Sequence, residues 1–180
     1  QQLPDRRHEK RNGKPSRAAI GSAPAPAAAA LGHGTAAVGA ELRTLAVLLL
    51  FELALPDGEV HRYAKIHPFT HGGETRHFDA GDTVVTVAFG GVRITPLVCY
   101  DLRFPELFAA VAERTDLFVV VASWPAVRAA TWAALLTARA IETQAYVLGV
   151  NRVGSGGGLD YRGGSRLVAP MGALVDGDAG

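Results

Sequence analysis

The sequence predicts an α/β fold, and three observations support this prediction. From about residue 41 onward, apolar runs of strand length alternate with segments of helical periodicity. Two turn signals, Pro56-Asp57-Gly58 and Gly90-Gly91, each separate a pair of strand-like runs. The chain has 180 residues, of which 48% are hydrophobic, so it is long enough to bury the core of one domain.

The first elements in chain order are two pairs of strands. Residues 43–66 are predicted to form two strands around the turn Pro56-Asp57-Gly58. Residues 83–99 are predicted to form a hairpin, because Val and Ile alternate on both sides of Gly90-Gly91.

Helices and buried strands alternate in the second half of the chain. A helix is expected to start in "FPELFAAVAER" with Pro105 in its first turn, and "DLFVVVASW" contains a fully apolar run of strand length. In "ATWAALLTARAIETQA", four residues follow helical spacing, and "YVLGVN" is a further buried strand. These four residues are Trp132, Leu135, Leu136 and Arg139. Residues 154–165 are predicted to be a loop, and a closing hairpin is expected over residues 165–175.

Composition narrows the class of protein. Residues 1–40 are rich in Ala, Gly, Pro and Arg and are expected to be disordered and outside the folded domain, which is assigned to residues 41–180. The formal charge of +1 argues against a nucleic-acid-binding surface. The apolar run 45–51 is shorter than the about 20 residues needed to cross a membrane. A single cysteine forms no internal disulfide, so a reducing, cytoplasmic location is expected.

That cysteine, Cys99, is the most informative residue of the chain. A lone Cys on an apolar strand is commonly a small buried residue. However, Cys99 ends the strand-like run "VRITPLVC" shortly before a predicted helix, where a side chain is presented to a cleft above the sheet edge. Lys65, at the end of another predicted strand, is a candidate cation that would favour the reactive thiolate, although most lysines are simply solvated.

Histidines near Lys65 raise the alternative of a metal site. They are His61, His67, His71 and His77. Their spacing is irregular and no cysteine joins them, so the sequence predicts no metal. It also contains no phosphate-cradling P-loop, because the glycine-rich segment 154–165 lacks the Lys-Ser/Thr ending.

Several long motifs in a fixed order resemble the nitrilase, or carbon–nitrogen hydrolase, superfamily. They are "YAKIHPF", Glu74 with "AGD", "PLVCYDLRFPEL", "ASWP" and "LLTARAIETQAYVLGVNRVG". The closest similarity is to the omega-amidase branch, and it covers about residues 55–175. The resemblance implies an α-β-β-α sandwich, here incomplete, with no cofactor and with assembly into a homo-oligomer.

The resemblance also implies roles for individual residues. Cys99 would attack the carbon of a small amide and form a thioester, with Lys65 and the backbone N–H of Tyr100 stabilising the oxyanion. Glu74 would position the lysine and the substrate amide, although an exposed loop acid is the simpler alternative. Trp124 would line the substrate pocket, or else be an ordinary core aromatic residue.

Structural roles are implied for four more residues near the motifs. Arg103 and Glu106 resemble a buried pair that supports the cysteine, and Asp101 would lie behind the reacting groups. Arg139 and Glu142 are three residues apart on a predicted helix and are expected to form an ion pair.

One expected feature has no match in the sequence. Family members carry a general-base glutamate in an N-terminal Pro-Glu motif, and no acid before Lys65 matches it; Glu52 lies in the wrong strand. The chain resembles a member that lacks its first third and its last segment. We expect hydrolysis of a small carboxylate-bearing amide. The alternatives are another amide, nitrile or carbamoyl substrate, or an inactive fragment; a cysteine peptidase is disfavoured because no histidine partner is suggested.

Overall fold

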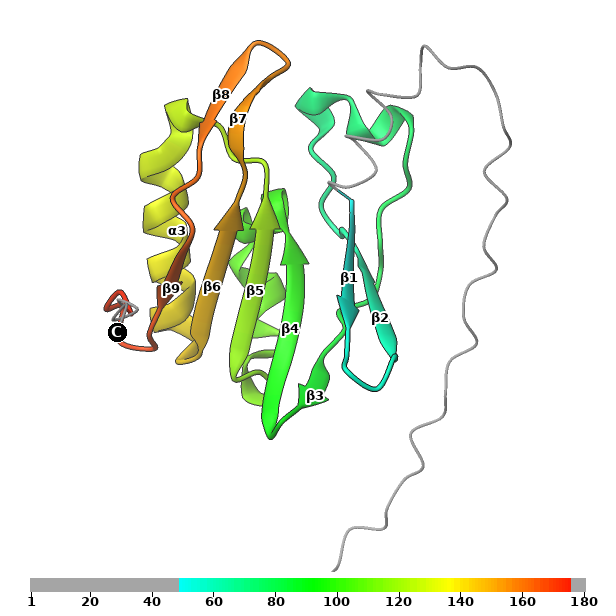
Figure 1. Ribbon diagram of the computed structural model, residues 1–180, viewed down its shortest axis with the longest axis vertical. Helices are drawn as coiled ribbons and strands as arrows, with labels where there is room; N and C mark the ends of the chain where they lie inside the picture. The colour runs from blue at the N-terminus through cyan, green and yellow to red at the C-terminus, as the bar shows by residue number, and fades with distance from the viewer. Residues whose placement is uncertain (1–48, 176–180) are drawn as a thin grey trace, which may run out of the picture. The chain divides into compact units, whose positions relative to one another are not determined.

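A computed structural model describes residues 49–175 and shows an α/β fold (Figure 1), as predicted. The main sheet has five strands in the order β3-β4-β5-β6-β9. Its central strands β4, β5 and β6 are parallel, and the edge strands β3 and β9 are antiparallel to their neighbours. The bounds of these strands are β3 Val87–Phe89, β4 Val92–Val98, β5 Leu117–Ala122, β6 Tyr146–Asn151 and β9 Arg166–Val168.

A separate two-stranded sheet precedes the main sheet in the chain. Strands β1 (Leu50–Ala54) and β2 (Val60–Ala64) pair antiparallel, which confirms the first predicted pair. The turn depends on Gly58, whose φ of 89° is readily adopted only without a side chain. Both strands pack near β4, and the buried Tyr63 of β2 joins the hydrophobic core.

The second predicted hairpin is also confirmed. Gly90 and Gly91 connect β3 to β4 with φ values of 58° and 83°, the conformation of a type I′ turn. From Thr95 to Val98, β4 is buried on both faces, as expected for a central parallel strand.

Helices follow β4 and β5 and contact each other. The first, α2 (Pro105–Ala109), starts at Pro105 as predicted but is short, because Val111 leaves the helical conformation (φ −127°) and inserts into the core. The second, α3 (Ala129–Thr143), packs on β6 and β9 (Figure 1). Short 3₁₀ turns complete the connections: η1 Thr70–Gly72, η2 Glu74–Arg76, η3 Cys99–Arg103, η4 Ala112–Arg114 and η5 Ala126–Arg128.

The core lies between these helices and the main sheet. Trp132 and Leu136 of α3 are almost fully buried, which confirms the predicted helical face. The rings of Phe108 and Phe118 join α2 to β5 with centroids 4.9 Å apart. Together these contacts join both helices to the main sheet.

The prediction of a loop over residues 154–165 is wrong. Strands β7 (Val153–Gly156) and β8 (Leu159–Arg162) form a hairpin with Gly157 and Gly158 at its turn. These glycines have φ values of 59° and 73°, again as in a type I′ turn. The strands escaped prediction because they are mostly exposed and carry no alternating apolar pattern. The expected closing hairpin is confirmed in a short form, with β9 bridged to Leu174 through Val168.

Gly149→Ala is expected to destabilise the protein by about 1–3 kcal/mol through overpacking. A Cβ at this buried position of β6 would lie 2.7 Å from Cζ2 of Trp132 and would also clash with Leu136. Gly156→Ala, in the exposed β7, is the matched control and should change stability by less than about 0.5 kcal/mol. Denaturant unfolding monitored by Trp fluorescence measures both. Equal stability of the two variants would contradict this account of the β6–α3 contact.

Two further points complete the description of the fold. Within residues 49–175, no helix combines the length and apolar character that spanning a bilayer requires. The segment 1–40, predicted to be disordered, lies outside the described residues.

Candidate active site

Cys99 lies at the carboxyl end of β4 and begins the turn η3. Its φ is 47°, a left-handed conformation that residues other than glycine seldom adopt. Backbone strain of this kind is commonly found where a side chain is held for function. The turn directs the partly buried thiol of Cys99 away from the sheet and into a pocket.

Lys65 and Glu74 form a buried ion pair close to this thiol. Lys65 follows β2 and Glu74 begins η2, and the Nζ and Oε2 atoms of the pair are 2.7 Å apart. The same Oε2 accepts a hydrogen bond of 2.6 Å from the backbone N–H of Phe69. Both side chains are almost completely buried, so the alternatives of a solvated lysine and an exposed loop acid are wrong.

Opposing effects act on the Cys99 thiol. Burial raises its pKa above the ordinary value, because it disfavours the thiolate. The ammonium of Lys65 and a hydrogen bond from the Ser123 backbone act in the opposite direction, and the carboxylates of Glu74 and Asp101 add smaller increases. The net effect is a raised pKa, so the nucleophile candidate is mostly a thiol at neutral pH.

Asp101 is buried behind the cysteine turn, as the sequence indicated. Its Oδ2 accepts hydrogen bonds from the Val98 N–H at 3.1 Å and from the Tyr63 hydroxyl at 2.8 Å. Its Oδ1 accepts one from the His67 N–H at 2.9 Å and lies 3.1 Å from Nδ1 of the same residue. Burial raises the pKa of Asp101, while these hydrogen bonds act to lower it.

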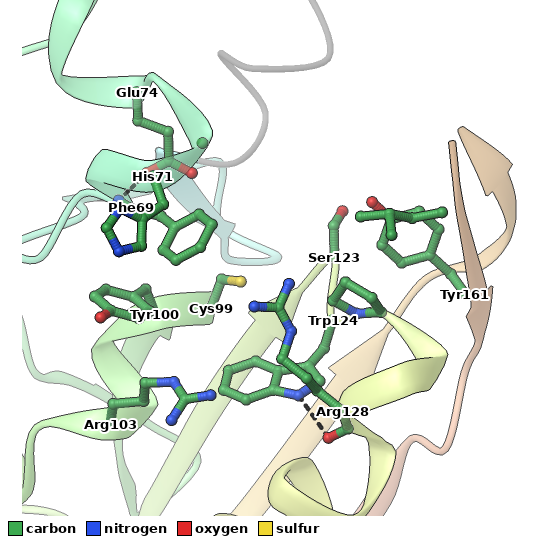
Figure 2. A pocket seen from close by; sticks show the side chains of 13 residues that line it. Phe69, His71, Glu74, Cys99, Tyr100, Arg103, Ser123, Trp124, Arg128 and Tyr161 are labelled. Atoms are coloured by element: carbon green, nitrogen blue, oxygen red, sulfur yellow. Dashed lines mark hydrogen bonds between the residues drawn. The ribbon is translucent and has the colours of Figure 1, made fainter. Parts of the chain in front are cut away.

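The pocket in front of Cys99 has a volume of about 400 Å³. Figure 2 shows the sulfur of Cys99 and the guanidinium of Arg128 projecting into it. Of the predicted site residues, Cys99, Glu74, Tyr100 and Trp124 line the pocket. Lys65 is not in the pocket wall, but its ammonium is paired with Glu74 and its charge acts on the Cys99 thiol. The remaining lining residues are Phe69, His71, Gly72, Arg103, Ser123, Pro125, Arg128, Leu159 and Tyr161.

The predicted buried pair of Arg103 and Glu106 is wrong. Both residues are exposed, and the structure gives no ion pair between them. Instead, the guanidinium of Arg103 lies over the rings of Tyr100 and Trp124, at 5.8 Å and 5.1 Å from their centroids. Arg103 is therefore part of the pocket wall.

Sequence reasoning missed Asn151, which fixes the Trp124 segment. Its side chain accepts a hydrogen bond from the Trp124 N–H at 2.7 Å and donates one to the Trp124 carbonyl at 3.0 Å. The signal was available, because Cys99, Ser123 and Asn151 stand at or just beyond the carboxyl ends of three adjacent parallel strands, which meet at one sheet edge. Trp124 is both buried and pocket-lining, so its two interpretations are compatible.

Other residues named from the sequence have structural roles. Arg139 and Glu142 form the predicted ion pair at 2.6 Å, and Arg139 also donates to the Leu102 carbonyl. Glu52 pairs with Arg62 on the exposed hairpin. In the described range, the structure contains no group of three or more His, Cys, Asp or Glu side chains able to hold a metal.

Comparisons with known proteins agree with this geometry. The family model described as carbon–nitrogen hydrolase matches residues 35–179. The omega-amidase YafV of Escherichia coli K12 is 52% identical over 126 residues, which cover 69% of this chain and 49% of that protein. The 2-oxoglutaramate amidase of Paenarthrobacter nicotinovorans is 39% identical over 119 residues, or 63% of this chain and 40% of that protein.

Solved structures give the same result. XC1258 from Xanthomonas campestris, described as a CN-hydrolase superfamily protein with an arsenic adduct in its active site, has a TM-score of 0.66 and 41% identity; the match covers 69% of this chain and 50% of that one. A mutant of the Nesterenkonia AN1 amidase, from the nitrilase superfamily, has a TM-score of 0.65 and 32% identity, covering 69% and 49%. These matches confirm the nitrilase-type fold.

The chain spans about half the length of the curated relatives it matches. The family match itself covers most of the chain and includes the cysteine turn, the lysine–glutamate pair and the pocket wall. On this evidence the chain belongs to the carbon–nitrogen hydrolase family.

Proposed function

We propose that this protein hydrolyses the terminal amide of a small carboxylate-bearing molecule through a thioester on Cys99. The observation that carries the proposal is the pocket itself, in which a thiol on a left-handed turn faces the cavity beside a buried Lys65–Glu74 pair. The relatives named as omega-amidase and 2-oxoglutaramate amidase support the choice of an amide.

The proposed reaction has two steps, acylation of Cys99 and hydrolysis of the resulting thioester. In the first, the sulfur of Cys99 bonds to the amide carbon, the carbon–nitrogen bond breaks, and the thiol proton leaves with the nitrogen as ammonia. In the second, water attacks the thioester carbon, the carbon–sulfur bond breaks, and a carboxylic acid and the free thiol are formed. Both steps pass through a tetrahedral intermediate with a negatively charged oxygen.

Two donors are assigned to that oxyanion. One is the Lys65 ammonium, and the other is the backbone N–H of Tyr100, the residue after the nucleophile. Glu74 holds the lysine through Oε2, while its Oε1 makes no hydrogen bond with the described residues. Oε1 is therefore assigned to accept a hydrogen bond from the substrate amide nitrogen.

The raised pKa of Cys99 means that attack requires a base to remove the thiol proton. Within residues 49–175, the pocket is lined by two side chains of the kind that acts as a base, Glu74 and His71. Glu74 is already bound to Lys65 and Phe69, and the structure gives no hydrogen bond between either side chain and the Cys99 sulfur. The base for the proton transfer is therefore not assigned to one of the described residues.

The opposite side of the pocket is suited to a carboxylate. Arg103 and Arg128 both line the pocket, and each guanidinium is held over an aromatic ring, at 5.1 Å from Trp124 and 5.7 Å from Phe69. Held this way, a planar guanidinium is well placed to bind a carboxylate. This charge favours an amide with a carboxylate at its far end over the uncharged nitriles and aliphatic amides that the superfamily also allows.

The proposal is tested with a glutaramate-type amide and with 2-oxo-acid amides. We expect ammonia release, and after acid quenching a mass increase equal to the acyl group on the peptide containing Cys99. A folded protein that shows neither ammonia nor adduct would be an inactive member of the family, which would refute the proposal. Assembly into a homo-oligomer and a cytoplasmic location stay predictions.

Arg128→Gln is expected to raise KM for the carboxylate-bearing amide about 10- to 100-fold, because one charge-assisted contact is lost. The KM for an uncharged amide of the same length should change by less than about threefold, since this substrate has no carboxylate to bind the guanidinium. Arg114→Gln, an exposed arginine outside the pocket, is the control. An equal increase in KM for both substrates would show that Arg128 supports the shape of the pocket and does not bind the carboxylate.

A further inference from the structure

We propose that Asp101 is a positioning residue that sets the distance between the nucleophile turn and the lysine-bearing segment by binding both with one carboxylate. This inference rests on the proposed function, because it assigns Cys99 and Lys65 to one reaction. Asp101 itself lies behind the pocket and does not line it, so it acts through the residues that it holds.

The two segments that must stay in register belong to different sheets. Lys65 follows β2 of the two-stranded sheet, whereas Cys99 follows β4 of the five-stranded sheet, and β2 and β4 are not paired. The backbone of Lys65 forms hydrogen bonds with the backbone of Leu49 and Gly81, which do not belong to the cysteine turn. Sheet pairing therefore does not set the distance between the thiol and the ammonium.

Asp101 connects the segment around Lys65 to the turn that carries Cys99. It accepts hydrogen bonds from Tyr63 and His67, which lie two residues before and two residues after Lys65. It also accepts one from Val98, the residue before Cys99. Among the described residues, every hydrogen bond that joins segment 63–67 to segment 98–101 ends on Asp101.

Burial and packing make this connection rigid. The Asp101 side chain is fully buried, so water does not compete for its oxygens. The rings of His67 and Phe104 are stacked, with centroids 3.6 Å apart and an interplanar angle of 6°. This stacking holds His67 in place beside Asp101. The Tyr63 ring is fully buried in the core, which holds the Tyr63 hydroxyl in place beside Asp101.

The charge of Asp101 separates a positioning role from an electrostatic one. Its carboxylate disfavours the Cys99 thiolate, so loss of the charge alone would make the thiol more acidic. Loss of register would instead move the Lys65 ammonium away and make the thiol less acidic. The two roles therefore predict opposite changes in thiol reactivity.

The experiment measures the rate of Cys99 alkylation by iodoacetamide as a function of pH. The chain has one cysteine, so the signal reports only this thiol and needs no turnover. We expect Asp101→Asn, which keeps the size of the side chain, to raise the apparent thiol pKa. Below that pKa, each unit of increase slows alkylation about tenfold.

A double-mutant cycle with Lys65→Gln tests the coupling directly. Lys65→Gln should slow alkylation about tenfold in the native protein and less than about threefold in the Asp101→Asn background. Equal slowing in both backgrounds, or a lower thiol pKa in Asp101→Asn, would overturn the proposal. Because no substrate is involved, this outcome is separate from any failure to release ammonia.

Tyr63→Phe provides a milder variant in case Asp101→Asn does not fold. It removes one of the hydrogen bonds to Asp101, together with the 3.3 Å bond that the Tyr63 hydroxyl accepts from the Ile66 N–H, and it keeps the buried ring. The effect of Lys65→Gln on alkylation should be weakened in this background as well, by about two- to threefold. An unchanged effect of Lys65→Gln in a folded Tyr63→Phe protein would likewise overturn the proposal.

Discussion

Cys99→Ser is expected to lower the rate of ammonia release by roughly 10⁴-fold or more, while the protein stays folded. Serine differs from cysteine by one atom and fits the left-handed turn equally well. However, its hydroxyl is a far weaker nucleophile than a thiol at neutral pH. The acyl adduct should disappear from the peptide containing residue 99.

A matched variant separates chemistry from pocket shape. Ser123 also lines the pocket, but only its backbone interacts with the Cys99 sulfur. Ser123→Ala should therefore change the rate by less than about threefold. Retention of ammonia release in Cys99→Ser would show that this cysteine is not the nucleophile.

Lys65→Gln is expected to reduce kcat by about 10²- to 10³-fold, the usual loss for one oxyanion donor. It should also destabilise the protein by about 3–5 kcal/mol, because the buried carboxylate of Glu74 loses its counter-charge. Steady-state kinetics and denaturant unfolding measure the two effects independently.

The double variant Lys65→Gln/Glu74→Gln distinguishes these effects. It removes both buried charges, so much of the stability should return, while the oxyanion donor stays absent and kcat stays low. Recovery of activity together with stability would mean that Lys65 supports the fold alone and takes no part in the reaction.

The strands and helices of the main sheet were predictable because burial leaves a strong pattern in the sequence. Residues 117–122 are apolar throughout and residues 146–150 carry no charged side chain, since both stretches belong to central parallel strands. The hairpin of β7 and β8 was not predictable in this way, because its strands are held by backbone pairing and a glycine turn while their side chains face solvent.

The candidate site likewise contains residues that the sequence predicted and residues that it did not. Cys99, Lys65 and Glu74 were located by motif resemblance, and the structure places them together. Arg103 was misplaced because a motif does not reveal whether an arginine is buried beside an acid or lies on an aromatic ring. Arg128 lines the pocket from the turn η5 and lies over the ring of Phe69, a contact between segments far apart in the sequence that depends on the three-dimensional arrangement. Asn151 was within reach of sequence reasoning, because it ends the strand beside the one that leads to Trp124.

The β7–β8 hairpin supplies Leu159 and Tyr161 to the pocket, yet it pairs only with itself. Substitutions at these two positions would reshape the cavity without disturbing a strand of the five-stranded sheet or a residue of the cysteine turn. Selection for a new substrate could thus proceed in the hairpin while the reactive groups stay unchanged. Chemistry and substrate choice are thereby separately evolvable in this architecture.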